Sequence, residues 1–178
     1  MTVDIAQSCP GLFDAAGAEA LSRVLQSSYM RRDDEHAVSA STMAEQLEAA
    51  YRAGSGGKGT VVAPCVVTGQ VGSGRSAEIR MSVIGHGADP GGGVPSGAEK
   101  GVRESRREKA GGVAFDCVSP ALGSTAEAPL RIDVTFENQW SRSDDDGKLA
   151  TAYLTIARSA ARAVAAELNC TGGGGLTG

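Results

Sequence analysis

The chain has 178 residues, enough for one domain with its own hydrophobic core. Its formal net charge is −4 and only 4% of its residues are aromatic, which disfavours both electrostatic binding to nucleic acid and stacking on its bases. No apolar run is long enough to span a membrane. We therefore expect a single domain over residues 1–171, without a transmembrane segment, followed by a disordered glycine-rich tail over residues 172–178 that buries nothing.

Two helices are expected in the first third of the chain. The first spans residues 14–26, where Asp14 suits the N-cap and an apolar stripe contains Leu21, Val24 and Leu25. The second begins at Thr42, because residues 42–45 match a capping box, in which side chains satisfy the first unpaired N–H groups. Its apolar face repeats at helical spacing and contains Met43, Leu47, Ala50 and Tyr51.

The segment GSGGKGT, residues 54–60, has the composition of a phosphate-binding loop. Such a loop needs a glycine five residues before the Gly-Lys pair and a hydroxyl residue directly after it. Here Arg52 stands at the first position and Gly59 at the second. The segment also leaves a helix and enters a strand, which is the reverse of the required order. We therefore expect a flexible connector and no nucleotide.

Four strands are expected after this connector. Their residue ranges are 60–67, 77–83, 112–118 and 130–136. Apolar and polar residues alternate in the second and the fourth, which predicts one buried and one wet face, as in an antiparallel sheet. The first is apolar throughout, although Pro64 favours an edge or a bulge.

An alanine-rich helix is expected from Leu149 to Leu168, with Arg158 and Arg162 off its apolar face. That face contains Leu149, Tyr153, Ile156, Ala160 and Val164. The run Asp144, Asp145 and Asp146 suits the positive end of the helix dipole and lacks the alternation of a calcium loop. The predicted fold is α+β, an antiparallel four-stranded sheet with helices packed on one face, in the order α-α-β-β-β-β-α.

A long flexible loop is expected over residues 85–112. It contains the one basic cluster of the chain, which consists of Arg103, Arg106, Arg107 and Lys109. These cations can dock an acidic partner or an anionic polymer, so the cluster is the candidate partner-binding surface. Glu104 and Glu108 lie among them at helical spacing, a pattern that is also typical of a solvated face of mixed charge.

The four cysteines, Cys9, Cys65, Cys117 and Cys170, contain no close pair of the kind that zinc or redox motifs use. They predict two structural disulfides, which persist in oxidising compartments; the alternative is four buried thiols in a cytosolic protein. The first ten residues do not form a signal peptide. We therefore expect a protein that is secreted or on the extracytoplasmic cell surface, with its leader removed.

Four segments carry the cysteines: CPGLFDAAGAEALSRVL, APCVV, VAFDCVSP and IARSAARAVAAELNC. Together they resemble a group of small actinobacterial, streptomycete-type secreted proteins and lipoproteins of largely unknown function. In that group the first cysteine precedes a helix and the last ends one. The resemblance covers the chain from Cys9 to Cys170; it implies location and architecture and supplies no active site.

Four cysteines allow three pairings. We expect Cys65 to pair with Cys117 across neighbouring strands, and Cys9 to pair with Cys170 and tie the first helix to the last. A helix-backed sheet would bring these elements together. In the chain-entropy model, each bridge over a loop of this length contributes on the order of 4 kcal/mol.

The functional expectation comes from exclusion, since the chain has no metal motif, no nucleotide loop and no G-x-S-x-G elbow, and the predicted disulfides would leave no free thiol. We expect an exported non-enzymatic module, without a cofactor, that binds another secreted or cell-surface protein. It would act alone or as a small adaptor subunit of a secreted assembly, such as an antibacterial toxin complex. The alternative is a secreted hydrolase with His36 or His86 as base and an acid from residues 144–146. Trp140 either anchors a partner or caps one end of the core.

Overall fold

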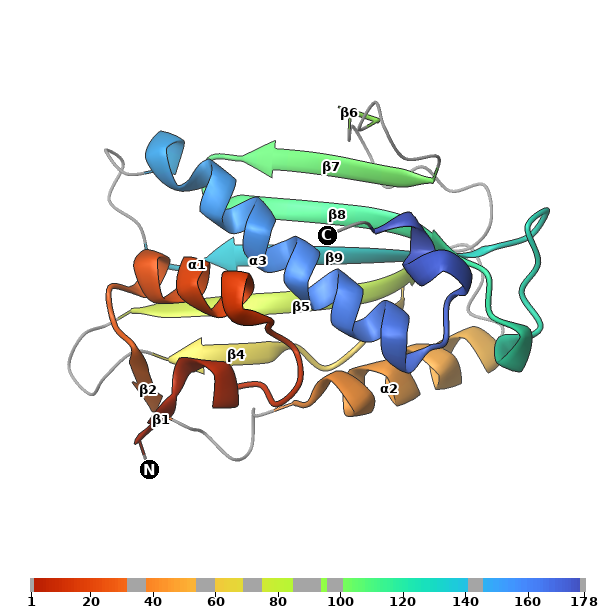
Figure 1. Ribbon diagram of the computed structural model, residues 1–178, viewed down its shortest axis with the longest axis horizontal. Helices are drawn as coiled ribbons and strands as arrows, with labels where there is room; N and C mark the ends of the chain where they lie inside the picture. Colours follow the sequence, from red (N-terminus) through yellow and green to blue (C-terminus); the bar gives the residue numbers. More distant parts are fainter. Residues whose placement is uncertain are drawn as a thin grey trace.

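A computed structural model describes residues 2–31, 38–53, 60–68, 75–84, 94–95, 101–140 and 146–176 (Figure 1). An antiparallel sheet forms one layer, and the helices form a second layer on one face of it. The fold is therefore α+β, as predicted.

The described helices are α1 (Ala15–Leu25), α2 (Ala40–Arg52) and α3 (Asp146–Glu167), with short 3-10 turns η1 (Ile5–Gln7), η2 (Pro120–Leu122) and η3 (Thr171–Gly175). The strands are β1 (Thr2–Asp4), β2 (Tyr29–Arg31), β3 (Thr60–Val61), β4 (Cys65–Thr68), β5 (Ser76–Ile84), β6 (Val94–Pro95), β7 (Val102–Arg107), β8 (Ala110–Cys117) and β9 (Leu130–Asn138). They form one sheet in the order β1-β2-β4-β5-β9-β8-β7-β6, and β3 pairs with β5 beside β4.

The prediction of four strands in the order α-α-β-β-β-β-α is wrong. Among the described residues, five strands have four residues or more, namely β4, β5, β7, β8 and β9. The segment predicted as one strand over residues 60–67 is divided into β3 and β4 by the stretch that contains Pro64, which cannot donate a ladder hydrogen bond. The short strands β1 and β2 flank α1 and, at three residues each, are too short for a period of two to be recognised.

The predicted loop over residues 85–112 also contains β7 and the start of β8. These strands form a hairpin in which Arg107 pairs with Ala110 across the turn Glu108–Lys109. Of the β7 side chains, only that of Val102 is buried in the core, so the hydrophobic alternation that marks a strand is absent there. The helical spacing of Glu104 and Glu108 was therefore misleading.

Both early helices were predicted correctly, but one cap was not. Asp14 is the N-cap of α1, and its Oδ1 accepts a hydrogen bond from the Gly17 N–H at 2.8 Å. The N-cap of α2 is Ser39 rather than Thr42, because the Ser39 hydroxyl accepts from the Thr42 N–H at 3.1 Å. Thr42 consequently lies inside the first turn.

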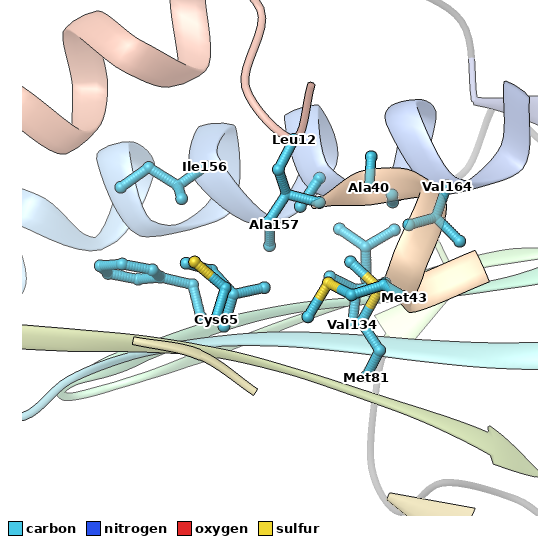
Figure 2. Packing of buried hydrophobic residues seen from close by; sticks show 14 of the residues in the cluster. Leu12, Ala40, Met43, Cys65, Met81, Val134, Ile156, Ala157 and Val164 are labelled. Atoms are coloured by element: carbon cyan, nitrogen blue, oxygen red, sulfur yellow. The ribbon is translucent and has the colours of Figure 1, made fainter. Parts of the chain in front are cut away.

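The core fills the layer between the helices and the sheet. Of the residues of β5 and β9 that were expected to face inward, those whose burial is described are all buried, namely Ala77, Ile79, Met81, Leu130, Ile132, Val134 and Phe136. Figure 2 shows part of this layer, with Ala157 and Val164 of α3 above Met81 and Val134 of the sheet. The alternation of these strands therefore specified their faces correctly.

The backbone of α3 comes very close to β8. A Cβ on Gly111 would lie 2.6 Å from the backbone carbonyl carbon of Tyr153, so no larger residue fits there without moving the helix. Tyr153 is fully buried, its hydroxyl accepts a hydrogen bond from Asn138 Nδ2 at 3.1 Å, and its ring centroid lies 5.6 Å from that of Phe136. This polar atom is therefore satisfied inside the core.

Side chains at the start of α1 attach it to α3. The Asp14 N–H donates to the Ser159 hydroxyl at 2.8 Å, and Arg162 donates to the Asp14 carboxylate. A Cβ on Gly17 would lie 2.3 Å from the Ser159 Oγ, so the two helices also touch where α1 has no side chain. The face of α3 predicted to be apolar is buried, except that Leu149 is half-buried.

Two disulfides are present, but both predicted pairings are wrong. Cys9 is bonded to Cys65, with Cα atoms 6.3 Å apart, and Cys117 is bonded to Cys170, with Cα atoms 5.0 Å apart. The strand order explains the error. β5 and β9 lie between β4, which carries Cys65, and β8, which carries Cys117, so these two cysteines are not on neighbouring strands.

The tail differs from the expectation that it buries nothing. The Thr171 N–H donates to the Val118 carbonyl at 2.8 Å, and residues 172–175 have positive φ, a conformation that favours glycine. Gly174 is buried, and a Cβ there would lie 2.6 Å from the Phe115 ring. Residues 171–176 therefore pack against β8, while residues 177–178 lie outside the described part.

We expect Gly111→Ala to lower the free energy of unfolding by about 2 kcal/mol or more, because the added methyl group collides with helix backbone that cannot rotate away. Gly147→Ala in the first turn of α3 is the control. Its Cβ would meet no atom within 4 Å, and this variant should lose no stability. Urea unfolding followed by circular dichroism measures both, and equal stability of the two variants would contradict the close packing.

We expect Asp14→Ala to lower the free energy of unfolding by about 1 kcal/mol, the usual effect of removing an N-cap. Partial burial would raise the pKa of Asp14, but hydrogen bonds from the Gly17 N–H, Arg162 and Ser159 outweigh it and bring the pKa below its ordinary 3.8. The carboxylate therefore stabilises the fold above pH 3.8, and this contribution is lost as the pH falls through the lowered pKa.

Asp14→Asn keeps a capping side chain and removes only the charge that faces Arg162, so it should lose less stability than Asp14→Ala at neutral pH. Its deficit relative to the wild type should shrink in acid. A deficit of Asp14→Asn that is the same at neutral and at strongly acidic pH would show that the charge does not contribute.

Candidate interaction surface

The basic cluster lies on an ordered hairpin rather than in a loop. Arg103 is a partly buried residue of β7, Arg106 and Arg107 are exposed at the end of that strand, and Lys109 is exposed in the turn. We call Arg106, Arg107 and Lys109 the tip cluster. With Glu108 beside them, these residues give the end of the hairpin a net positive charge on a protein whose overall charge is negative.

Strand alternation directs the cations of β7 to opposite faces of the sheet. Val102 is buried in the core, and Glu104 forms an ion pair with Arg158 of α3, so the even-numbered residues face the helices. Arg106 follows on that side, two residues after Glu104. Arg103 and Arg107 consequently lie on the far face of the sheet, meaning the face opposite the helices.

The far face carries charges that are largely paired. Arg131 Nε donates to Asp116 Oδ1 at 2.7 Å, and the second bond of this bidentate pair is 3.0 Å long. Arg80 makes a bidentate pair with Glu78, which is buried and also accepts from Gln139 Nε2 at 2.7 Å. These pairs lie along β5, β8 and β9 and connect neighbouring residues, which makes them part of the sheet's own structure.

Asp133 is a further acid on this face, and its side chain is partly buried. It lies on β9 between Ala114 of β8 and Ser82 of β5. Burial raises the pKa of Asp133 above its ordinary 3.8, and the positive charge of Arg107 opposes this increase only in part. Arg107 is therefore electrostatically coupled to a carboxylate, although the two form no direct ion pair among the described contacts.

Of the alternative hydrolase site, Asp146 is the first residue of α3. His36, His86, Asp144 and Asp145 lie outside the described residues, and so do the glycines of the connector 54–59. Trp140 is described and half-buried, and the Arg75 guanidinium lies 4.3 Å from the centre of its ring. Arg75 in turn donates to the Leu25 carbonyl at 3.0 Å, so this tryptophan links the end of β9 to α1. Its role as a partner anchor stays a prediction.

Sequence reasoning missed two members of this surface. Glu104 was taken for a solvated charge, although it pairs with Arg158, and Asp133 was not singled out at all. The alternation of β9 does place Asp133 on the wet face. Its coupling to Arg107 depends on β8 lying between β7 and β9, and no local signal in the chain specifies that strand order.

Within the described part of the chain, no group of three histidine, cysteine or acidic residues is arranged to hold a metal ion. No helix there is long and apolar enough to cross a membrane. Comparison of the chain with protein-family models, with curated proteins and with solved structures finds no match.

We expect Asp133→Asn to raise the melting temperature at pH 7. A carboxyl group whose pKa is raised on folding binds protons more tightly in the folded state, so its ionisation weakens the fold as the pH increases. The amide avoids that cost, and the advantage of the variant should disappear below about pH 3.8, where the unfolded chain is protonated too.

Asp116→Asn is the control for this experiment, because it breaks the bidentate pair with Arg131 and should lower the melting temperature at pH 7. Differential scanning calorimetry across the pH range measures both variants. A lower melting temperature of Asp133→Asn at pH 7 would show that Arg107 compensates fully for the burial.

Proposed function

We propose that this protein is an exported, non-enzymatic module that binds another secreted or cell-surface protein through the β7–β8 hairpin. The observation that carries the proposal is the tip cluster, a set of exposed cations at the end of an ordered hairpin. Ordered support lowers the entropy that a surface loses on binding. The partner we propose is correspondingly acidic at its contact surface.

The two disulfides support the location outside the cytoplasm. Bridges Cys9–Cys65 and Cys117–Cys170 join the N-terminal segment to β4 and the tail to β8. Structural disulfides of this kind are typical of proteins in oxidising compartments. The same bridges occupy all four cysteines, so none is available as a nucleophile.

The hairpin is held on three sides, which suits a binding element. The Arg158–Glu104 ion pair connects β7 to α3, and the packing of α3 on Gly111 fixes β8. The turn itself is attached to β9, since the Lys109 carbonyl accepts a hydrogen bond from the Asn138 N–H at 2.8 Å. A partner would meet this surface close to its bound geometry.

The test is affinity purification of the tagged, disulfide-bonded protein from the culture supernatant of its source. A stoichiometric partner should be recovered, and a variant with Arg106, Arg107 and Lys109 changed to Glu should lose it. The control reverses charges elsewhere, at Arg23 of α1 and Arg52 of α2, whose side chains are also exposed. It should retain the partner, because these cations lie on helices away from the hairpin.

The alternative is the secreted hydrolase that uses His36 or His86. If the protein is recovered alone, and if His36→Ala or His86→Ala abolishes a hydrolytic activity found by substrate screening, the binding function is wrong. Size-exclusion chromatography of a recovered complex would show whether the protein is one small subunit of a larger assembly.

A further inference from the structure

We propose that two copies of this chain associate through the far face of the sheet, with β8 of one copy lying over β8 of the other. The inference goes beyond the proposed function, because it concerns a face of the sheet rather than the end of the hairpin and requires no other protein. It rests on the strand register, which places charges of opposite sign on the two sides of β8.

The far face is a broad surface on which no helix of the described part lies (Figure 1). An antiparallel sheet can leave such a face to water. The centre of this face is nevertheless partly withdrawn from water, since Gly112 and Ala114 of β8 are buried and Asp133, Thr135 and Glu137 of β9 are half-buried. A carboxylate in such surroundings is screened less by solvent and attracts a nearby cation more strongly.

Three cross-strand rows of the far face share one composition. In each row a glycine or alanine of β8 lies between a longer residue of β7 and a longer residue of β9. The rows are Arg103–Ala114–Asp133, Ser105–Gly112–Thr135 and Arg107–Ala110–Glu137. Two cations and a hydroxyl therefore lie along one side of β8, and two carboxylates and a hydroxyl lie along the other side.

The charges at the two ends of a row do not pair within one copy. Neighbouring strands are about 4.8 Å apart, so the Cα atoms of Arg107 and Glu137 are separated by about 10 Å, and both side chains project away from the sheet. Arg107 and Asp133 make no hydrogen bond or ion pair with a described residue. Glu137 forms an ion pair with Arg80 at 3.7 Å, and this pair is exposed and therefore weak.

A twofold axis that lies between two copies and runs about parallel to β8 makes these rows complementary. The rotation places β7 of one copy over β9 of the other, because these two strands are equally far from β8. Arg107 then faces Glu137 of the second copy, at the same level along the strand. Each such contact is formed twice, once in each direction, as in every isologous dimer.

The short side chains of β8 suit this arrangement. Two sheets that pack face to face keep their strands within about 30° of each other, at a separation of about 10 Å. Ala110, Gly112 and Ala114 place no long side chain where the two copies of β8 cross, so the charged side chains beside them can reach across.

The same geometry distinguishes a second copy from other occupants. A polypeptide segment with charges of one sign would satisfy only one side of β8 and would be repelled by the other side. A surface that satisfies both sides must carry the two rows in reversed order. The chain itself presents that order, and so we assign the far face to a homodimer.

Sedimentation velocity of the purified, disulfide-bonded protein tests the dimer at concentrations from about 1 μM to about 1 mM. Arg103 already interacts within its own protein, so the test uses Arg107 and Glu137. Arg107→Glu and Glu137→Arg should each weaken the dimer about tenfold or more, because each change brings like charges together at two symmetry-related places. Arg23→Glu and Glu19→Arg on α1 are controls with the same changes in net charge, and both should dimerise like the wild type.

Mixing the two weakened variants gives the decisive measurement. In a dimer of one Arg107→Glu copy and one Glu137→Arg copy, both symmetry-related contacts again join opposite charges. The equimolar mixture should therefore dimerise about as strongly as the wild type, while each variant alone does not. Misfolding of a variant cannot produce this recovery, and circular dichroism verifies the fold of each.

Three results would overturn the inference: a wild-type protein that stays monomeric over the whole concentration range, variants that dimerise like the wild type, or a mixture that does not recover. The proposed function is tested separately. If Glu137→Arg abolishes the dimer but still recovers a partner in affinity purification, both hold on different surfaces. A dimer without any recovered partner leaves the inference standing and removes the proposed function, and a partner bound by a monomeric wild type does the reverse.

Discussion

The close approach of α3 to β8 is the contact on which the rest of the structure depends. Gly111 allows the helix backbone at Tyr153 to reach the sheet, and the Tyr153 hydroxyl still finds a partner there in Asn138. Packed this closely, α3 covers β8 and β9 (Figure 1). Another side of α3 contacts α1 at Gly17. Because α1 packs on α3, the position of one glycine in the sheet determines the arrangement of both helices.

Local patterns in the sequence were sufficient to predict the helices and strands whose apolar residues recur with a clear helical or strand period. The alternation of β5 and β9, the apolar stripe of α1 and the alanine-rich face of α3 each bury one side against a common core, so period and burial coincide. Asp14 was recognised as a cap because its carboxylate satisfies an N–H group within the same turn. β7 was missed because an outer strand with charges on both faces has no hydrophobic period.

The remaining errors of the sequence analysis concern residues that are far apart in the sequence but close together in the fold. The pairing of cysteines depends on which strands are neighbours, and β9 enters the sheet between β5 and β8 although it follows both in the sequence. The residues around Cys65 and Cys117 do not indicate that β9 lies between β5 and β8. The coupling of Arg107 to Asp133 has the same origin, since β8 must first pair with β7 on one side and with β9 on the other. The cationic cluster itself was visible in the sequence. Its division between the two faces of the sheet could be seen only once its arginines were known to lie on a strand, β7.

The same helix that orders the core also shapes the charge of the hairpin. Arg158 projects from α3 to Glu104, and this ion pair both fixes β7 and occupies the carboxylate that lies two residues before Arg106 on the same face of the strand. The electrostatic surroundings of Arg106 therefore depend on the packing of α3 as well as on the composition of the hairpin. A partner that binds Arg106 would thus detect a surface that exists only in the folded protein, because in the unfolded chain Glu104 and Arg106 are close neighbours of opposite charge.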